Sequence, residues 1–142
     1  TNKGNGIRLN TDNINVYKLS ASGDKSLILT EGENISSIDT IIPDNKLLLF
    51  VTASGKIKVT EMKYFPKSKR RAEPMGLINL DNTEEIKLIK TVNTNNRIKL
   101  LTRKGVVHEI EVSDLKPVSR LARAEKLLKN MRGDEIVHVL IQ

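Results

Sequence analysis

The 142-residue sequence contains no cysteine and no tryptophan, and it has only two phenylalanines and two tyrosines. Without a thiol, the chain can form no disulfide, no thiolate metal site and no cysteine nucleophile, which fits a reducing compartment. So few aromatic rings argue against a deep aromatic ligand pocket and against a platform on which bases stack. The composition therefore points away from thiol chemistry and from aromatic ligand sites.

Long apolar runs are also missing. The longest is about six residues, whereas a membrane-spanning helix needs roughly 20. No charged-then-apolar leader opens the sequence, which predicts no signal peptide within it. A core is nonetheless available, because Ile, Leu and Val together number 42. This argues against disorder and predicts one domain, or part of one, with no membrane partner.

Recognisable catalytic motifs are absent as well. His108 and His138 lie thirty residues apart with no companion at metal-ligand spacing. There is no Gly-rich phosphate loop, no Gly-x-Ser-x-Gly elbow and no His-Glu-x-x-His motif. The acidic pairs Glu84-Glu85 and Asp134-Glu135 precede expected strands, and we interpret them as solvated turn residues. The sequence therefore predicts no catalysis by this chain alone, no cofactor and no metal.

What the sequence does contain is an internal repeat. The tetrapeptide Thr-x-x-Gly occurs at residues 1–4, 52–55 and 102–105, with offsets of 51 and 50. The second and third copies stay in step at further positions, among them Glu61 with Glu111 and Arg70 with Arg120. The first copy is more diverged. We therefore predict repeat units of approximately 1–51, 52–101 and 102–142.

Each copy has the patterns of β-strands. Residues 46–52 are an apolar run closed by a Gly turn, and residues 56–60 alternate with a period of two. Further strands are expected at 76–80 and 86–92. About four strands per fifty residues predict an all-β, propeller-like array of four-stranded blades, with about three blades in this sequence. Because the first and last copies begin and end within a unit, we expect a fragment of a larger domain.

Residues 119–131 allow two interpretations. Their Ala, Leu, Arg and Lys content is typical of an amphipathic helix, which would favour a helical nucleic-acid reader. Such a reader would need a helix-turn-helix partner, and none is evident. In register with the second copy, the same segment is a basic loop followed by a strand at 127–131. We follow the repeat.

Charge is distributed unevenly over the +7 total. Residues 1–51 carry a net charge of −1, residues 52–101 carry +6 and residues 102–142 carry +2. The densest stretch, residues 63–71, has five bases and no acid, and the third copy repeats it weakly at Lys116, Arg120 and Arg123. A solubilising surface is one explanation. A polyanionic partner is the other, since clustered Lys and Arg bind duplex DNA strongly and without sequence preference.

Four stretches resemble a known family: residues 48–58, 74–80, 114–123 and 133–136. Their order and spacing are similar to those of the C-terminal domain of bacterial type IIA topoisomerase A subunits, which belong to DNA gyrase and topoisomerase IV. The resemblance implies a β-pinwheel whose basic rim binds and bends or wraps double-stranded DNA. It further implies a non-catalytic part of an ATP-dependent enzyme in the bacterial cytoplasm, at the nucleoid. Its protein partners would be the ATPase B subunit and the N-terminal part of the A subunit.

The gyrase box, Gln-Arg-Arg-Gly-Gly-Lys-Gly, is absent from this sequence. Residues 69–76 keep its bases and lose its glycines, which favours topoisomerase IV, but a gyrase fragment without the box-bearing blade would have the same sequence features. The expected DNA contacts are the bases of the loops and adjoining strands. Lys56 and Lys58 alternate with Ile57 and Val59, so we expect the two lysines to face outward. The full set is Lys56, Lys58, Lys63, Lys67, Lys69, Arg70, Arg71, Arg103, Lys104, Arg120, Arg123 and Lys126. The alternative function is a propeller-like protein-interaction module with no nucleic-acid role.

Overall fold

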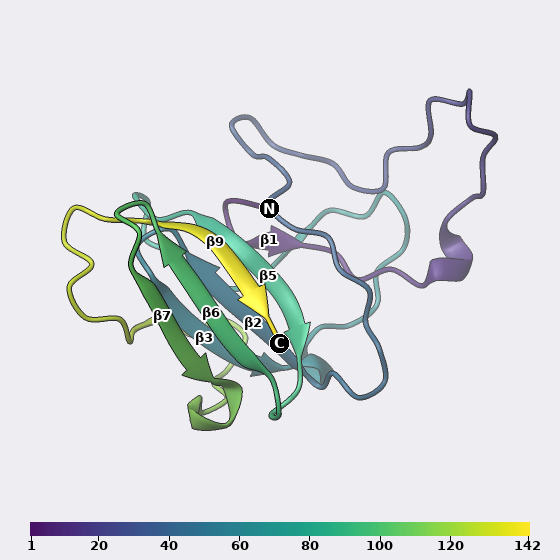
Figure 1. Ribbon diagram of the computed structural model, residues 1–142. Helices are drawn as coiled ribbons and strands as arrows, with labels where there is room; N and C mark the ends of the chain where they lie inside the picture. The colour runs from purple at the N-terminus through teal and green to yellow at the C-terminus, as the bar shows by residue number, and fades with distance from the viewer.

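The computed structural model describes residues 1–142 as three antiparallel sheets joined by loops, with no α-helix (Figure 1). The strands are β1 (Asn5–Gly6), β2 (Leu47–Thr52), β3 (Lys56–Glu61), β4 (Met75–Gly76), β5 (Ile86–Val92), β6 (Arg97–Thr102), β7 (Val107–Glu111), β8 (Glu125–Lys126) and β9 (Ile136–Ile141). Three single-turn 3-10 helices recur at the repeat spacing: η1 (Thr11–Asn13), η2 (Met62–Tyr64) and η3 (Val112–Asp114). The all-β prediction is confirmed, and the helical interpretation of residues 119–131 is wrong.

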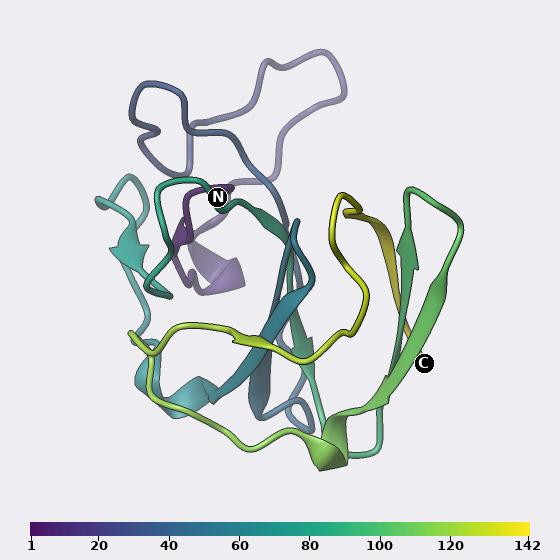
Figure 2. The ribbon, with the colours of Figure 1, turned by 90° about the vertical axis from the view of Figure 1, so that its left-hand side faces the viewer.

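Neighbouring copies exchange short strands. One sheet has the order β5-β2-β3-β8, a second has β7-β6-β9, and β1 pairs with β4. β4 leaves the second copy to pair with β1 of the first, and β8 leaves the third copy to pair with β3 of the second. Only one sheet has the four strands expected of every blade. In Figure 2, the segment containing β8 crosses in front of the sheet to which it adds.

Three of the longer strands lie where the sequence predicts them, whereas the short strands β4 and β8 do not. β2, β3 and β5 match the expected residues within one position. The strand expected at 76–80 is limited to Met75–Gly76, and Leu77 and Ile78, which follow it, are both buried in the cluster that includes Phe50. The strand expected at 127–131 is replaced by β8, two residues earlier. There, Asn130 has a φ of 60° and turns the chain out of the extended conformation.

β2 is buried on both faces, which explains its uninterrupted apolar sequence. Leu47, Leu49 and Val51 pack between this sheet and the β7-β6-β9 sheet, in a cluster that includes Ile98 and Leu100. Leu48 and Phe50 point the other way, into a second cluster built largely from the loop that follows β3. The sheets are therefore stacked side by side, and each packs on the next through such a cluster.

The three Thr-x-x-Gly turns share one hydrogen-bond pattern. In each, the Gly amide donates to the Thr carbonyl, and the residue after the Gly donates its amide to the Thr hydroxyl. An acidic side chain from later in the copy binds each turn: Glu33, Glu84 or Asp134. The Ser54 hydroxyl, for example, donates to Glu84 at 2.6 Å. Glu84 and Asp134 are therefore turn-binding residues. The interpretation as solvated residues is wrong for Glu84, whose side chain is only 7% exposed, whereas the hydrogen bond of Asp134 is at the surface.

Gly55 and Gly105 provide a matched pair for testing these turns. Both have positive φ, 79° and 82°, so an alanine at either position is strained by about 1–2 kcal/mol. A Cβ at Gly55 would also lie 2.9 Å from Leu128 Cδ1 and 3.1 Å from Met131 Cε, whereas Gly105 has open space. We expect Gly55→Ala to lower the free energy of unfolding by about 1–3 kcal/mol more than Gly105→Ala does. Urea titrations would measure the difference, and equal losses would contradict this packing.

Glu33 makes the stability of the first turn depend on pH. Burial alone would raise the pKa of Glu33, but hydrogen bonds from Thr1, Thr30 and Asn5 outweigh burial and lower the pKa to about 2. A lowered pKa means that the carboxylate stabilises the fold above pH 4.5 and that this stabilisation is lost as the pH falls toward 2. Between about pH 5 and pH 3, Glu33→Gln should therefore lose less unfolding free energy than the wild type does. Exposed Glu31→Gln is the control, and a Glu33→Gln profile identical to that of the wild type would refute the assignment.

Candidate nucleic-acid interface

Two basic loops lie at the same edge of the molecule. We call residues 62–76 outer loop two and residues 112–126 outer loop three. Each begins with a 3-10 turn and ends in a short strand that joins the preceding sheet. Together they carry nine of the 24 Lys and Arg residues but only three of the 17 Asp and Glu residues. Figure 2 shows outer loop three running up to the side of outer loop two.

Specific contacts hold the two loops together. The Arg120 guanidinium of outer loop three donates to the carbonyl oxygen of Gly76 in outer loop two. Arg123 pairs with Asp81 at 2.9 Å, and Asp81 also pairs with Lys56 at 3.2 Å. Because β8 also adds to β3, the end of outer loop three is fixed against the second copy by backbone and side chains alike.

Lys58 is at the centre of this junction and is only 3% exposed. Its Nζ donates to the carbonyl oxygens of Leu77, Ser119, Arg120 and Ala122 at 2.6 to 3.4 Å, and it lies 4.7 Å from the centroid of the Phe50 ring. Burial, aided by the charge of Arg120, lowers the pKa of Lys58 to about 8. The prediction that Lys58 faces outward is therefore wrong, because outer loop three covers this face of β3.

Lys56, two residues earlier, is also engaged within the protein. Its ammonium lies 3.1 Å from Glu84 and 3.2 Å from Asp81. The hydrogen bond to Glu84, followed by that to Asp81, raises the pKa of Lys56. A phosphate would have to compete with two carboxylates for this cation, so Lys56 is a poor candidate for a DNA contact.

Other bases of the two loops are freely available. Lys67, Lys69, Lys116 and Lys126 are exposed and form no ion pair. Lys116 was outside the predicted set, although its place in the loop would have indicated it. Lys63 is exposed but pairs with Glu61 at 2.6 Å. These side chains form a basic edge along both loops.

Arg70 and Arg71 share an acidic partner that the sequence did not reveal. Asp24, in the loop that follows η1, lies 2.5 Å from Arg70 Nη1 and 3.8 Å from Arg71 Nη2. Asp24 is 46 residues away from Arg70 in the sequence, and no local pattern links the two. Only the folded chain shows that part of the densest basic stretch is neutralised.

Arg103 and Lys104 lie apart from the two loops. They occupy the third Thr-x-x-Gly turn, at the opposite end of β7 from η3. Arg103 pairs with Glu135, and the Lys104 amide donates a hydrogen bond to the Asp134 carboxylate at 3.2 Å. The structure therefore does not bring these two predicted residues to the basic edge.

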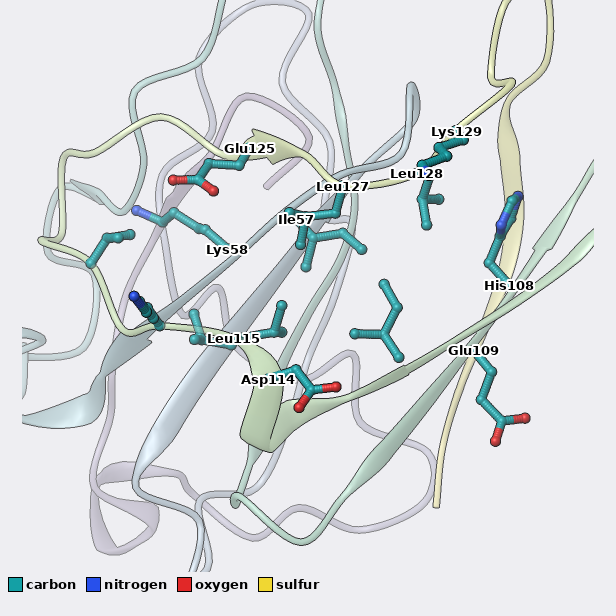
Figure 3. A pocket seen from close by; sticks show the side chains of 14 residues that line it. Ile57, Lys58, His108, Glu109, Asp114, Leu115, Glu125, Leu127, Leu128 and Lys129 are labelled. Carbon is teal, nitrogen blue, oxygen red and sulfur yellow. The ribbon is translucent and has the colours of Figure 1, made fainter.

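A cleft of about 570 Å³ opens beside outer loop three, between β3 and β7 (Figure 3). Two of its lining residues are smaller than their counterparts in the second copy. Leu115 lies in the cleft, whereas its counterpart Phe65 is buried in the preceding cluster; likewise, His108 takes the place of Lys58. His138 lies on the other face of the same sheet, since the two histidines oppose consecutive residues of β6. The structure brings no three metal-binding side chains together.

The curated relatives of this chain are DNA gyrase A subunits. No family model matches the chain. The DNA gyrase A protein of Lawsonia intracellularis is 27% identical over 146 residues, covering 99% of this chain and 18% of that protein. The DNA gyrase A protein of Deinococcus deserti is 26% identical over 144 residues, covering 96% of this chain and 18% of that protein. The chain thus spans less than a fifth of the length of these curated relatives.

Solved structures show the same fold. The C-terminal domain of DNA topoisomerase IV superimposes with a TM-score of 0.91 at 19% identity, covering 99% of this chain and 44% of that one. The DNA gyrase A C-terminal domain superimposes with a TM-score of 0.83 at 19% identity, covering 97% of this chain and 47% of that one. None of the helical segments here has the length and hydropathy of a membrane span.

Proposed function

We propose that this chain, which belongs to the C-terminal domains of type IIA topoisomerase A subunits, binds duplex DNA along its two outer loops. The family is that of DNA gyrase and topoisomerase IV. The observation that carries the proposal is the junction of these loops, which joins nine bases and three acids in a single edge. Phosphate contacts of this kind give binding that is independent of sequence and sensitive to salt.

The proposed contacts follow the exposed and half-exposed bases of the two loops. They are Lys63, Lys67, Lys69, Arg70, Arg71, Lys116, Arg120, Arg123 and Lys126. Lys58, which is buried, and Lys56, which pairs with both Glu84 and Asp81, are removed from the set, and Arg103 and Lys104 lie outside the edge. In this proposal the three sheets are blades of a β-pinwheel, whose rim bends or wraps DNA. The chain itself would catalyse nothing and would act within an A subunit, beside the ATPase B subunit in the bacterial cytoplasm.

Fluorescence anisotropy with two duplexes of unrelated sequence tests this function. We expect similar affinities for both duplexes. We also expect a fall of at least about a hundredfold between roughly 50 and 200 mM salt, because each phosphate neutralised contributes about 0.9 to the log–log slope. An affinity that hardly changes with salt would contradict the proposal and would favour a protein-interaction module.

A further inference from the structure

We propose that Asp24 is an internal competitor for DNA phosphate, holding Arg70 and Arg71 in the free protein and limiting the DNA affinity of outer loop two. This inference rests on the proposed function. It concerns the one acidic side chain that reaches the densest basic stretch from another part of the chain. Each carboxylate oxygen of Asp24 faces one of the two arginines, Oδ2 toward Arg70 and Oδ1 toward Arg71.

The Asp24 carboxylate is held in place on its own side. The Tyr17 hydroxyl donates to Oδ2, and Asn15 Nδ2 donates to the same oxygen at 3.2 Å. Asn15 also donates to the Tyr17 oxygen at 3.0 Å, so the three side chains form a closed set. The hydrogen bond from Tyr17, followed by the charge of Arg70, the hydrogen bond from Asn15 and the charge of Arg71, lowers the pKa of Asp24. The acid is therefore already oriented toward the arginines.

The backbone on the other side is fixed as well. The Arg71 amide donates to the carbonyl of Ser26 at 2.9 Å, two residues beyond Asp24. Arg71 itself has a φ of 60°, a conformation that a non-glycine residue seldom adopts. The loop after η1 and outer loop two are thus joined by a backbone hydrogen bond next to the ion pairs. The meeting of Asp24 with the two arginines is accordingly part of the fold.

Carboxylate and phosphate oxygens use the same guanidinium donors, so one displaces the other. Displacement is sterically open, because the side chains of Arg70 and Arg71 are 32% and 62% exposed and that of Asp24 is 29% exposed. Lys67 and Lys69 of the same loop have no such partner. Of the five bases of the loop, Lys67 and Lys69 are free, Lys63 pairs with Glu61, and Arg70 and Arg71 must first be released from Asp24.

The test is the DNA-binding salt titration on Asp24→Asn, which removes the charge and keeps the size of the side chain. We expect affinity at about 0.1 M salt to rise about five- to tenfold and the log–log slope to steepen by about one to two, one phosphate for each released arginine. Asp24→Glu retains the charge and should stay near wild type. Exposed Asp12→Asn makes the same change in net charge within the same segment, at a side chain that forms no ion pair, and should give a much smaller gain.

A second set of variants isolates the arginines. In a chain carrying Arg70→Ala and Arg71→Ala, adding Asp24→Asn should bring no more gain than Asp12→Asn does. Circular dichroism and urea unfolding of each variant would identify any that has lost its fold. A gain from Asp24→Asn no larger than that from Asp12→Asn, or a loss of affinity, would overturn the inference while leaving wild-type binding intact. If the wild type itself shows no salt-dependent binding, the proposed function and this inference both fail.

Discussion

Replacing Lys67, Lys69, Lys116 and Lys126 together with alanine is expected to weaken DNA binding by about two orders of magnitude at about 0.1 M salt. These four side chains are exposed, lie on the two outer loops and form no ion pair. Each phosphate contact contributes about 0.9 to the log–log salt slope. The slope should therefore flatten by about two to four, equally for all duplex sequences, and anisotropy between roughly 50 and 200 mM salt would measure it.

A control variant with the same change in net charge distinguishes the contribution of the basic edge from that of the net charge of the whole protein. Four other exposed lysines without ion pairs lie outside the two loops: Lys18, Lys46, Lys87 and Lys104. Replacing all four with alanine should reduce affinity only modestly, because distant surface charges are largely screened at about 0.1 M salt. Equal losses in the two variants would mean that net charge alone drives binding and that the basic edge does not define the DNA path.

Lys58→Met is expected to lower the free energy of unfolding by about 2–4 kcal/mol. Methionine fills a similar volume against Phe50, but it leaves four carbonyl oxygens without the Nζ donor. An unsatisfied buried polar group costs about 1–3 kcal/mol, and the cost for several neighbouring carbonyls is partly shared. The variant should also loosen outer loop three, which hydrogen exchange at residues 119–122 would detect as faster opening. Urea unfolding would give the stability loss.

Lys56→Met provides the comparison on the same strand. Its ammonium also has two partners, but the lysine side chain is 30% exposed and Asp81 is 43% exposed, and Glu84, which is 7% exposed, keeps its hydrogen bonds from Ser54. Ion pairs that reach solvent contribute about 0–1 kcal/mol, so this substitution should cost clearly less than Lys58→Met. If both variants were equally stable, water would have replaced Lys58 at the carbonyls, and the junction would not depend on a buried cation.

Much of the strand framework could be predicted because its signals are local. The apolar run of β2, the alternation in β3 and the Thr-x-x-Gly turns are each contained in a short stretch of sequence. The repeat added a second constraint and correctly overruled the helical propensity of residues 119–131. Tertiary context routinely outweighs such propensities, and here the same segment supplies β8 to a neighbouring sheet.

The candidate site was predicted less completely, since side-chain availability depends on distant segments. The basic composition of outer loop two was evident in the sequence, and so was its weaker copy in outer loop three. Lys58, however, belongs to a strand with clean alternation, and nothing local indicates that residues 119–122 will cover it. The partnership of Asp24 with Arg70 is similarly non-local, because the two belong to different copies of the repeat.

By itself, then, the sequence determined an all-β repeat with fifty-residue spacing, the positions of its long strands and the loops that carry its positive charge. Hydrophobic period, turn chemistry and net charge are properties of short stretches, so they can be read without the fold. Only the tertiary structure decided which of those charged side chains are exposed and unpaired. Strand exchange brings β4 and β8 to neighbouring sheets, buries Lys58 beneath outer loop three and sets Asp24 against Arg70 and Arg71. Burial and ion pairing depend on which segments pack against one another, and here those segments lie far apart in the sequence.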